Sequence, residues 1–193
     1  MRWGKRFVPH FLYSVLFAVS ANIFADSTRF AFGVNAEDFS LSTYRVDDEG
    51  RLRHLGHQPM DKAPSSVVID PSGQFVVAVS STSDRLMVFR LNAETGALQP
   101  VPGSPFVSGT RSPFSLRFHP SGRFAYVGSR FSGVGAYSFD PKTGALNILP
   151  GSPFPAQRRT RELTIHPSGN FLYAANGYSN SVSAYRINEK TGA

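Results

Sequence analysis

A stretch of roughly 40–50 residues recurs along the chain, and this internal repeat constrains the fold more than any other feature. A Pro-Ser-Gly turn begins, at nearly equal intervals, at Pro71, Pro120 and Pro167. A Thr-Gly-Ala turn begins, at exactly equal intervals, at Thr95, Thr143 and Thr191. A period in this range is typical of a repeat architecture, in which each copy forms one supersecondary unit.

Each copy contains four short runs with the character of β-strands. In one copy these runs cover residues 115–118, 124–128, 134–139 and 146–149. They are rich in Val, Phe and Tyr and are bounded by Gly, Pro, Asn and Asp, as strands and their turns are. Four strands in roughly 40–50 residues predict the blade of a β-propeller. A helical solenoid is the alternative, but the Pro-Ser-Gly and Thr-Gly turns interrupt the long runs of 3.6-residue periodicity that it needs.

The predicted fold class is therefore all-β, a propeller of four-stranded antiparallel blades. We expect the blades, numbered in chain order, over about 29–56, 65–102, 114–150 and 162–193. Blade 1 has no recognisable first strand, and blade 4 stops after its third. Propellers typically close with about 4–8 blades, so we expect this chain to be the N-terminal portion of a longer propeller. Open blade edges favour self-association or a protein partner.

The N-terminal segment, 1–25, has the layout of a secretory signal peptide. Basic side chains precede an apolar core at 11–21, and candidate cleavage sites end at Ala21 and Ala25. An uncleaved membrane anchor is the alternative, but this core is short for a span of about 20 residues. We therefore expect an exported protein, periplasmic or extracellular, whose propeller portion is 26–193 and which has no membrane contact after cleavage.

The composition fits export and narrows the chemistry. The chain has no Cys, which excludes thiol nucleophiles and thiolate metal ligands. The formal net charge is +7, but three of the 20 basic side chains and none of the 13 acidic ones lie in the segment 1–25, so the remainder carries +4. No stripe of basic and aromatic side chains is present, and we expect no nucleic-acid partner.

We also expect no metal and no cofactor. His119 and His166 occupy the same turn position, which Asp70 takes in another copy. All three side chains are able to form the local hydrogen bonds that such a turn needs, whereas the spacing of the histidines matches no set of metal ligands. A role in stabilising the turn is therefore the preferred interpretation.

Loops that differ between copies are the better functional candidates, because the turns shared by all copies serve the blade itself. The most charged loop consists of Arg158, Arg159, Thr160, Arg161 and Glu162. Three guanidinium groups beside the central face of a propeller are able to hold a carboxylate or a phosphate. A solvated basic loop is the alternative. On the ligand hypothesis, the residues that bind substrate are Arg158, Arg159, Arg130 and Asn176.

The repeat motifs also resemble those of a known family. His-Pro-Ser-Gly, Ser-Val-x-x-Tyr, and Thr-Gly-Ala-Leu followed by Gly-Ser-Pro-Phe are similar to the repeats of the seven-bladed β-propeller lactonases. This is the family of the propeller-type 6-phosphogluconolactonases and the fungal muconate cycloisomerase. The resemblance covers about residues 29–193, and it implies a complete propeller of seven blades.

The resemblance also implies an active site on the central face. In the family this site uses an Arg in a Pro-Arg-His stretch and a Glu in an Asn-Glu pair. By position, Arg161 matches the Arg, although Thr160 and Glu162 replace its neighbours, and Gly177 stands where the Glu is expected. Lactone hydrolysis needs a base and a cation that stabilises the developing oxyanion. The matched positions supply only the cation. A different residue, Glu162 or Glu37, is then the candidate for the base.

Two hypotheses follow. The first is a hydrolase of a sugar-acid or related lactone, in which Arg161 is the electrophilic or anion-holding residue. The second is a non-catalytic exported propeller that presents its face or rim to a partner. The family resemblance favours the first, whereas the missing carboxylate, the expected truncation and the export signal favour the second.

Overall fold

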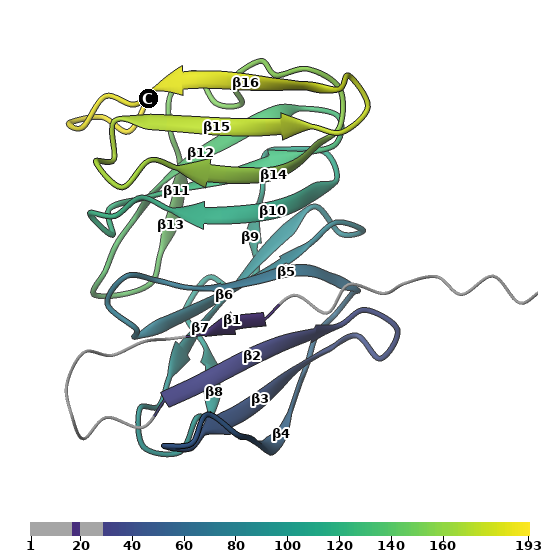
Figure 1. Ribbon diagram of the computed structural model, residues 1–193, viewed down its shortest axis with the longest axis vertical. Helices are drawn as coiled ribbons and strands as arrows, with labels where there is room; N and C mark the ends of the chain where they lie inside the picture. The colour runs from purple at the N-terminus through teal and green to yellow at the C-terminus, as the bar shows by residue number, and fades with distance from the viewer. Residues whose placement is uncertain (1–16, 20–28) are drawn as a thin grey trace, which may run out of the picture.

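The computed structural model describes residues 17–19 and 29–193. Within these ranges the chain forms antiparallel sheets, and none of it forms a helix that is long and apolar enough to cross a membrane. The sheets follow one another along the chain and stack face to face, from purple at the bottom of Figure 1 to yellow at the top. Their first strands are neighbours in space: β5 contacts β10, and β10 contacts β14.

The strands of blade 1 are β1 (Phe17–Val19), β2 (Arg29–Asn35), β3 (Ser40–Val46) and β4 (Leu52–Pro59). Those of blade 2 are β5 (Pro64–Ile69), β6 (Phe75–Ser80), β7 (Arg85–Leu91), β8 (Leu98–Pro100) and β9 (Phe106–Val107), which pairs with β7. Those of blade 3 are β10 (Pro113–Phe118), β11 (Phe124–Ser129), β12 (Gly133–Phe139) and β13 (Leu146–Ile148). Blade 4 has β14 (Thr160–Ile165), β15 (Phe171–Asn176) and β16 (Ser181–Arg186). The predicted all-β fold of antiparallel blades is confirmed.

Blade 1 differs from the expectation that its first strand is missing. The structure places β1 antiparallel to β2, with Ala18 opposite Phe32 in the register. β1 belongs to the stretch with the layout of a signal peptide, most of which lies outside the described residues. The physical reason for the pairing is the edge of β2, whose N–H and C=O groups need partners that an extended segment within reach provides.

The Thr-Gly-Ala turns connect neighbouring blades as well as neighbouring strands. A Cβ added to Gly144 comes within 2.7 Å of the Phe75 ring, and one added to Gly96 comes within 2.6 Å of the Phe30 ring. In each case the ring belongs to the preceding blade. Gly144 and Gly96 both have φ of +78°. Glycine is therefore needed here twice, for the left-handed backbone and for the close approach to the ring.

Arginine side chains hold the same turns from the preceding blade. Arg45 donates a hydrogen bond to the carbonyl oxygen of Glu94 at 3.0 Å, and Arg90 donates one to that of Lys142 at 2.7 Å. Arg123 makes the corresponding bond to the turn of blade 4. Because carbonyls of a turn often lack strand partners, these bonds satisfy acceptors and fix the distance between blades.

The Pro-Ser-Gly turns form similar connections. His119 is buried, and its Nδ1 accepts a hydrogen bond from the N–H of Ser121 at 3.1 Å. Its Nε2 therefore carries the proton of the neutral ring, and it donates to the carbonyl oxygen of Gly169 in the next blade at 3.0 Å. In blade 2, a carboxylate oxygen of Asp70 accepts a hydrogen bond from the N–H of Ser72, as Nδ1 of His119 does from the N–H of Ser121. The interpretation of these side chains as turn-stabilising is confirmed.

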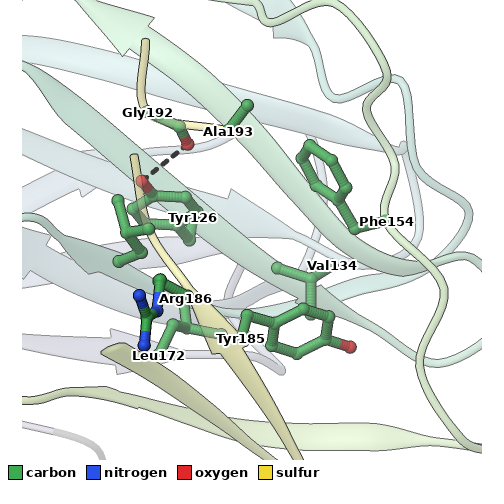
Figure 2. Close-up of a pocket in the computed structure, with 9 residues that line it drawn as sticks. Tyr126, Val134, Phe154, Leu172, Tyr185, Arg186, Gly192 and Ala193 are labelled. Atoms are coloured by element: carbon green, nitrogen blue, oxygen red, sulfur yellow. Dashed lines mark hydrogen bonds between the residues drawn. The ribbon is translucent and has the colours of Figure 1, made fainter. Parts of the chain in front are cut away.

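The core lies between blades and consists largely of the second and third strands. Phe124 and Tyr126, expected as core aromatics, are only 5% and 3% exposed. Tyr126 donates a hydrogen bond to the carbonyl oxygen of Gly192 at 2.8 Å (Figure 2), and burial raises the pKa of its hydroxyl. On the face of blade 4 that points away from blade 3, Phe171 and Tyr173 are each 36% exposed.

Gly144→Ala is expected to destabilise the protein more than the matched control Gly50→Ala. The two glycines have nearly the same φ, +78° and +79°, so both variants carry a left-handed strain of roughly 1–2 kcal/mol. Only at Gly144 does the added methyl group also meet the Phe75 ring, since nothing lies within 4 Å at Gly50. Overpacking adds about 1–3 kcal/mol. Urea denaturation measures the difference, and equal losses would contradict a role for the ring contact.

Candidate functional site

The candidate site lies where the first strand of blade 4 begins. The pairing of β14 with β15 shifts register between Thr160 and Glu162, and Arg161 is the extra residue of this β-bulge. The first strands of blades 2 and 3 have the same irregularity at Ser65 and Phe114. A bulge turns its extra side chain away from the direction of the regular strand. The position matched to the Arg of the family thus has a backbone that blades 2 and 3 share, and its side chain is what distinguishes it.

Arg161 lies across Gly177, the position matched to the Glu of the family. A Cβ added to Gly177 comes within 2.9 Å of Cδ and 3.1 Å of Nε of Arg161. Blade 3 shows the same juxtaposition, with Cζ of Arg130 at 4.7 Å from the ring centroid of Phe114. In this fold, the bulge residue and the residue after the second strand thus meet. A carboxylate at position 177 would stand beside the guanidinium.

Glu162 is directed toward the neighbouring blade. One of its carboxylate oxygens, Oε1, lies 2.8 Å from a guanidinium nitrogen of Arg117 on β10 and accepts a hydrogen bond from the N–H of Leu163 at 2.9 Å. The carboxylate that sequence reasoning offered as a base is thus paired with a cation. Sequence reasoning missed Arg117. A charged residue at an alternate position of a strand predicts only that its side chain is partly exposed, and not that it pairs with a carboxylate of the next blade.

Asn176 is buried, with 1% of its surface exposed. Its amide nitrogen donates to the hydroxyls of Ser183 at 2.9 Å and Ser181 at 3.3 Å, and its oxygen accepts from the hydroxyl of Thr160 at 3.1 Å. Asn35 makes equivalent bonds to two serines in blade 1. This arrangement joins the start of β14 to β16 through the end of β15, so Asn176 ties the three strands together beside the contact between Arg161 and Gly177.

Arg158 and Arg159 both stack on the exposed ring of Tyr178, with Cζ at 5.2 Å from the ring centroid. Arg111 stacks on Phe131 at the same distance, one blade earlier. Stacking uses the face of a guanidinium and leaves its N–H donors at the edge. These arginines therefore keep the donors that an anion needs, on loops at the same end of the blades as Arg161.

The arrangement supplies cations more readily than bases. Within 29–193, no group of three or more His, Asp or Glu side chains comes together as a metal site would require. A guanidinium is suited to stabilise the oxyanion of an acyl-transfer reaction or to bind an acidic substituent. Activation of water requires a base as well, and the carboxylate nearest in sequence to Arg161 is that of Glu162.

Comparison with known proteins establishes the family. The family described as Lactonase, 7-bladed beta-propeller matches residues 19–110 and 101–193. The chain belongs to this family. The 6-phosphogluconolactonase of Erwinia tasmaniensis is 26% identical to it over 159 residues, which cover 78% of this chain and 45% of the relative. That of Bacillus subtilis is 24% identical and covers 86% and 52%. The chain thus spans about half the length of these curated relatives.

Solved structures agree on the fold. The periplasmic gluconolactonase of Pseudomonas aeruginosa has a TM-score of 0.72 at 19% identity, over 85% of this chain and 48% of that protein. A protein from Lactobacillus plantarum has a TM-score of 0.71 at 16% identity, over 93% and 53%. The resemblance seen in the repeat motifs is therefore confirmed by sequence and by architecture.

Asn176→Ala is expected to lower the free energy of unfolding by about 1–3 kcal/mol, because it leaves the buried hydroxyl of Thr160 without its partner. Asn147→Ala, at an exposed position of β13, is the control and should change stability by less than about 0.5 kcal/mol. Thermal and urea denaturation measure both. A raised KM for a lactone with unchanged stability would contradict this structural role and support the predicted role of Asn176 in substrate binding.

Proposed function

We propose that this protein hydrolyses the lactone of a sugar acid, as a 6-phosphogluconolactonase-like member of its family. The observation that carries the proposal is the position of Arg161, a bulge residue of an inner strand lying across the residue that the family uses as Glu. From this position a guanidinium stabilises negative charge on a lactone carbonyl oxygen or holds an acidic substituent.

In the proposed reaction a water oxygen adds to the carbonyl carbon, and the acyl C–O bond of the ring then breaks. The ring oxygen leaves as a hydroxyl after it takes up the proton that the base removed from the water, and the product is the open-chain acid. Arg161 stabilises the tetrahedral oxyanion. Glu162 is the candidate base for the water, oriented by its ion pair with Arg117 at 2.8 Å.

Substrate binding is assigned to the arginines around Arg161. The guanidinium groups of Arg158, Arg159 and Arg130 stack on aromatic rings at 5.2, 5.2 and 4.7 Å. Their N–H donors suit the carboxylate or phosphate of an acidic ligand. No cofactor takes part in this chemistry.

We also propose that the protein acts outside the cytoplasm. The signal-peptide layout of the segment 1–25 supports this location. So does the fold shared with a periplasmic gluconolactonase. An exported enzyme does not meet cytoplasmic phosphosugars, so a lactone without a phosphate is the preferred substrate class.

Arg161→Ala is expected to lower kcat/KM for lactone hydrolysis by about 10²-fold or more, the scale of losing one group that stabilises an oxyanion. Arg161→Lys should recover only part of this loss, because a point charge does not reproduce the planar fork of a guanidinium. Arg53→Ala, at an exposed position of β4 outside the site, is the control. The assay uses a panel of γ- and δ-lactones, and equal rates in all variants would remove Arg161 from the site.

If the unsubstituted protein hydrolyses no lactone in the panel, this result would support the second hypothesis, a non-catalytic exported propeller.

Gly177→Glu is expected to raise kcat/KM by about tenfold or more, because it places a candidate base beside Arg161. The φ of this position is not in the left-handed region, and the atoms nearest to an added Cβ are Cδ, Nε and Cγ of Arg161 at 2.9–3.3 Å, so the Arg161 side chain has to shift to admit the new residue. Gly177→Gln is the matched control, of the same size without a carboxylate. Equal activity of the two variants would contradict a requirement for a base at this position.

A further inference from the structure

Blades 3 and 4 carry the same pair of a guanidinium and an exposed aromatic ring on their loops. Cζ of Arg111 lies 5.2 Å from the ring centroid of Phe131 in blade 3, and Cζ of Arg158 lies 5.2 Å from that of Tyr178 in blade 4. In each blade the arginine stands two residues before the first strand, and the ring stands two residues after the second. We call each pair an arginine–aromatic clamp.

The backbone holds both clamps in the same way. The N–H of Arg111 donates to Oγ of Ser132 at 2.9 Å, and the N–H of Arg158 donates to Oγ of Ser179 at 3.1 Å. Each bond ties the loop before the first strand to the loop after the second strand. The cation and the ring therefore meet because the loops that carry them are joined, in two blades alike.

The two clamps lie on adjoining loops. The N–H of Arg159 in blade 4 donates to the carbonyl oxygen of Arg130 in blade 3 at 3.2 Å. Arg159 directly follows the arginine of one clamp, and Arg130 directly precedes Phe131, the ring of the other. Blade 3 has a described blade on each side, and Phe131 is nevertheless 63% exposed. Its ring thus stays open to solvent although blades 2 and 4 are both in place.

A blade does not need a clamp in order to fold. In blade 2 the equivalent positions carry Lys62 and Thr82, which form no such pair, and the blade still has its antiparallel sheet. The rings of Phe131 and Tyr178 are more than half exposed, so they add little to the core between blades. Loop features that the scaffold does not require are the ones available for binding.

The clamps also carry positive charge that the described residues do not neutralise. None of the ion pairs within the described blades includes Arg111, Arg158 or Arg159. Asp84 contacts the loop of the first of these, but its Oδ1 accepts from the N–H of Ser112 at 2.7 Å. A stacked guanidinium keeps its edge donors for a carboxylate, and the ring beside it offers apolar surface. Each clamp therefore suits a ligand with a carboxylate next to an apolar face.

We propose that the two clamps form a binding surface for a linear acidic polysaccharide, a chain of uronic acid units. Each unit has a carboxylate for the guanidinium and a face of C–H groups for the ring. A ligand of repeating units matches a motif that recurs on adjoining blades, and binding at one clamp raises the effective concentration of the chain at the other. The surface extends beyond the residues assigned to the lactone, since Arg111 and Phe131 take no part in the proposed hydrolysis.

Two other polyanions are weaker matches. Single-stranded nucleic acid also uses aromatic rings and cations, but the export that we propose favours a polysaccharide. An anionic bilayer calls for a broad apolar face or a lipid chain, whereas each clamp offers one ring beside a cation. Both polyanions are included in the experiment.

The experiment titrates galacturonic acid and its oligomers of increasing length into the purified protein by calorimetry. We expect oligomers that reach both clamps to bind about tenfold tighter than the monomer, or more. Their methyl esters should bind about tenfold more weakly, because they lack the carboxylates that a guanidinium recognises. A single-stranded DNA oligonucleotide and vesicles of phosphatidylglycerol are titrated in parallel. Absence of oligomer binding, equal binding of the methyl esters, or tighter binding of DNA or vesicles would overturn the proposal.

Variants of the blade 3 clamp supply a second test. Arg111→Ala and Phe131→Ala should each lower the affinity for a long oligomer by about tenfold, because only one clamp remains. Lys62→Ala is the matched control: it removes an exposed charge at the equivalent position of blade 2, where no ring is present. It should change the affinity by less than about twofold, since an exposed charge is screened by salt.

All three variants should keep the thermal transition of the unsubstituted protein, because the altered side chains are exposed. Equal losses for Arg111→Ala and Lys62→Ala would mean that net charge alone attracts the polymer, and this result would also overturn the proposal. None of these measurements depends on lactone hydrolysis, so failure of the proposed reaction and failure of the binding surface are distinguishable.

Discussion

Blades 2, 3 and 4 each pack against the preceding blade through a glycine of the Thr-Gly-Ala turn and a phenylalanine ring, as Gly144 does on Phe75. The contact requires a left-handed backbone and the absence of a Cβ, which explains why the turn recurs at equal intervals along the chain. Arginine–carbonyl hydrogen bonds fix these turns, which lie at one end of the blades. The inner strands β5, β10 and β14 are then neighbours. The loops at the opposite ends of the strands then gather on one face.

The candidate site arises from differences between copies on that common frame. Three blades have a β-bulge at the start of the inner strand, and its extra residue is Ser65, Phe114 or Arg161. Only the last of these is a cation. The backbone therefore directs the extra side chain in the same way in these three blades, and the identity of that side chain decides what chemistry a blade is able to offer. The pairing of Glu162 with Arg117 shows that the neighbouring blade also shapes the site.

The fold was accessible from the sequence because its determinants are local. Turn residues, strand alternation and a fixed period identify a propeller, and Phe124 is recognisable as a core residue by its place in the repeat. Features that depend on distant parts of the chain were not accessible. The ion pair of Glu162 joins two blades, and β1 lies in a stretch whose composition indicates a signal peptide. The assignment of Asn176 to substrate binding stays a prediction, and its hydrogen bonds to buried and half-buried hydroxyls are visible only in three dimensions.

Within residues 29–193, the hydrogen bonds described above that join blades connect each blade to the next. The bond from Arg45 to Glu94 and the bond from His119 to Gly169 both connect immediate neighbours. The energetics of such a molecule resemble those of a one-dimensional chain of coupled units, in which a perturbation weakens with each interface it crosses. A substitution in blade 4 is thus felt strongly in blade 3 and weakly in blade 1. The loops of the candidate site are therefore able to change in one blade while the stability of the distant blades is conserved.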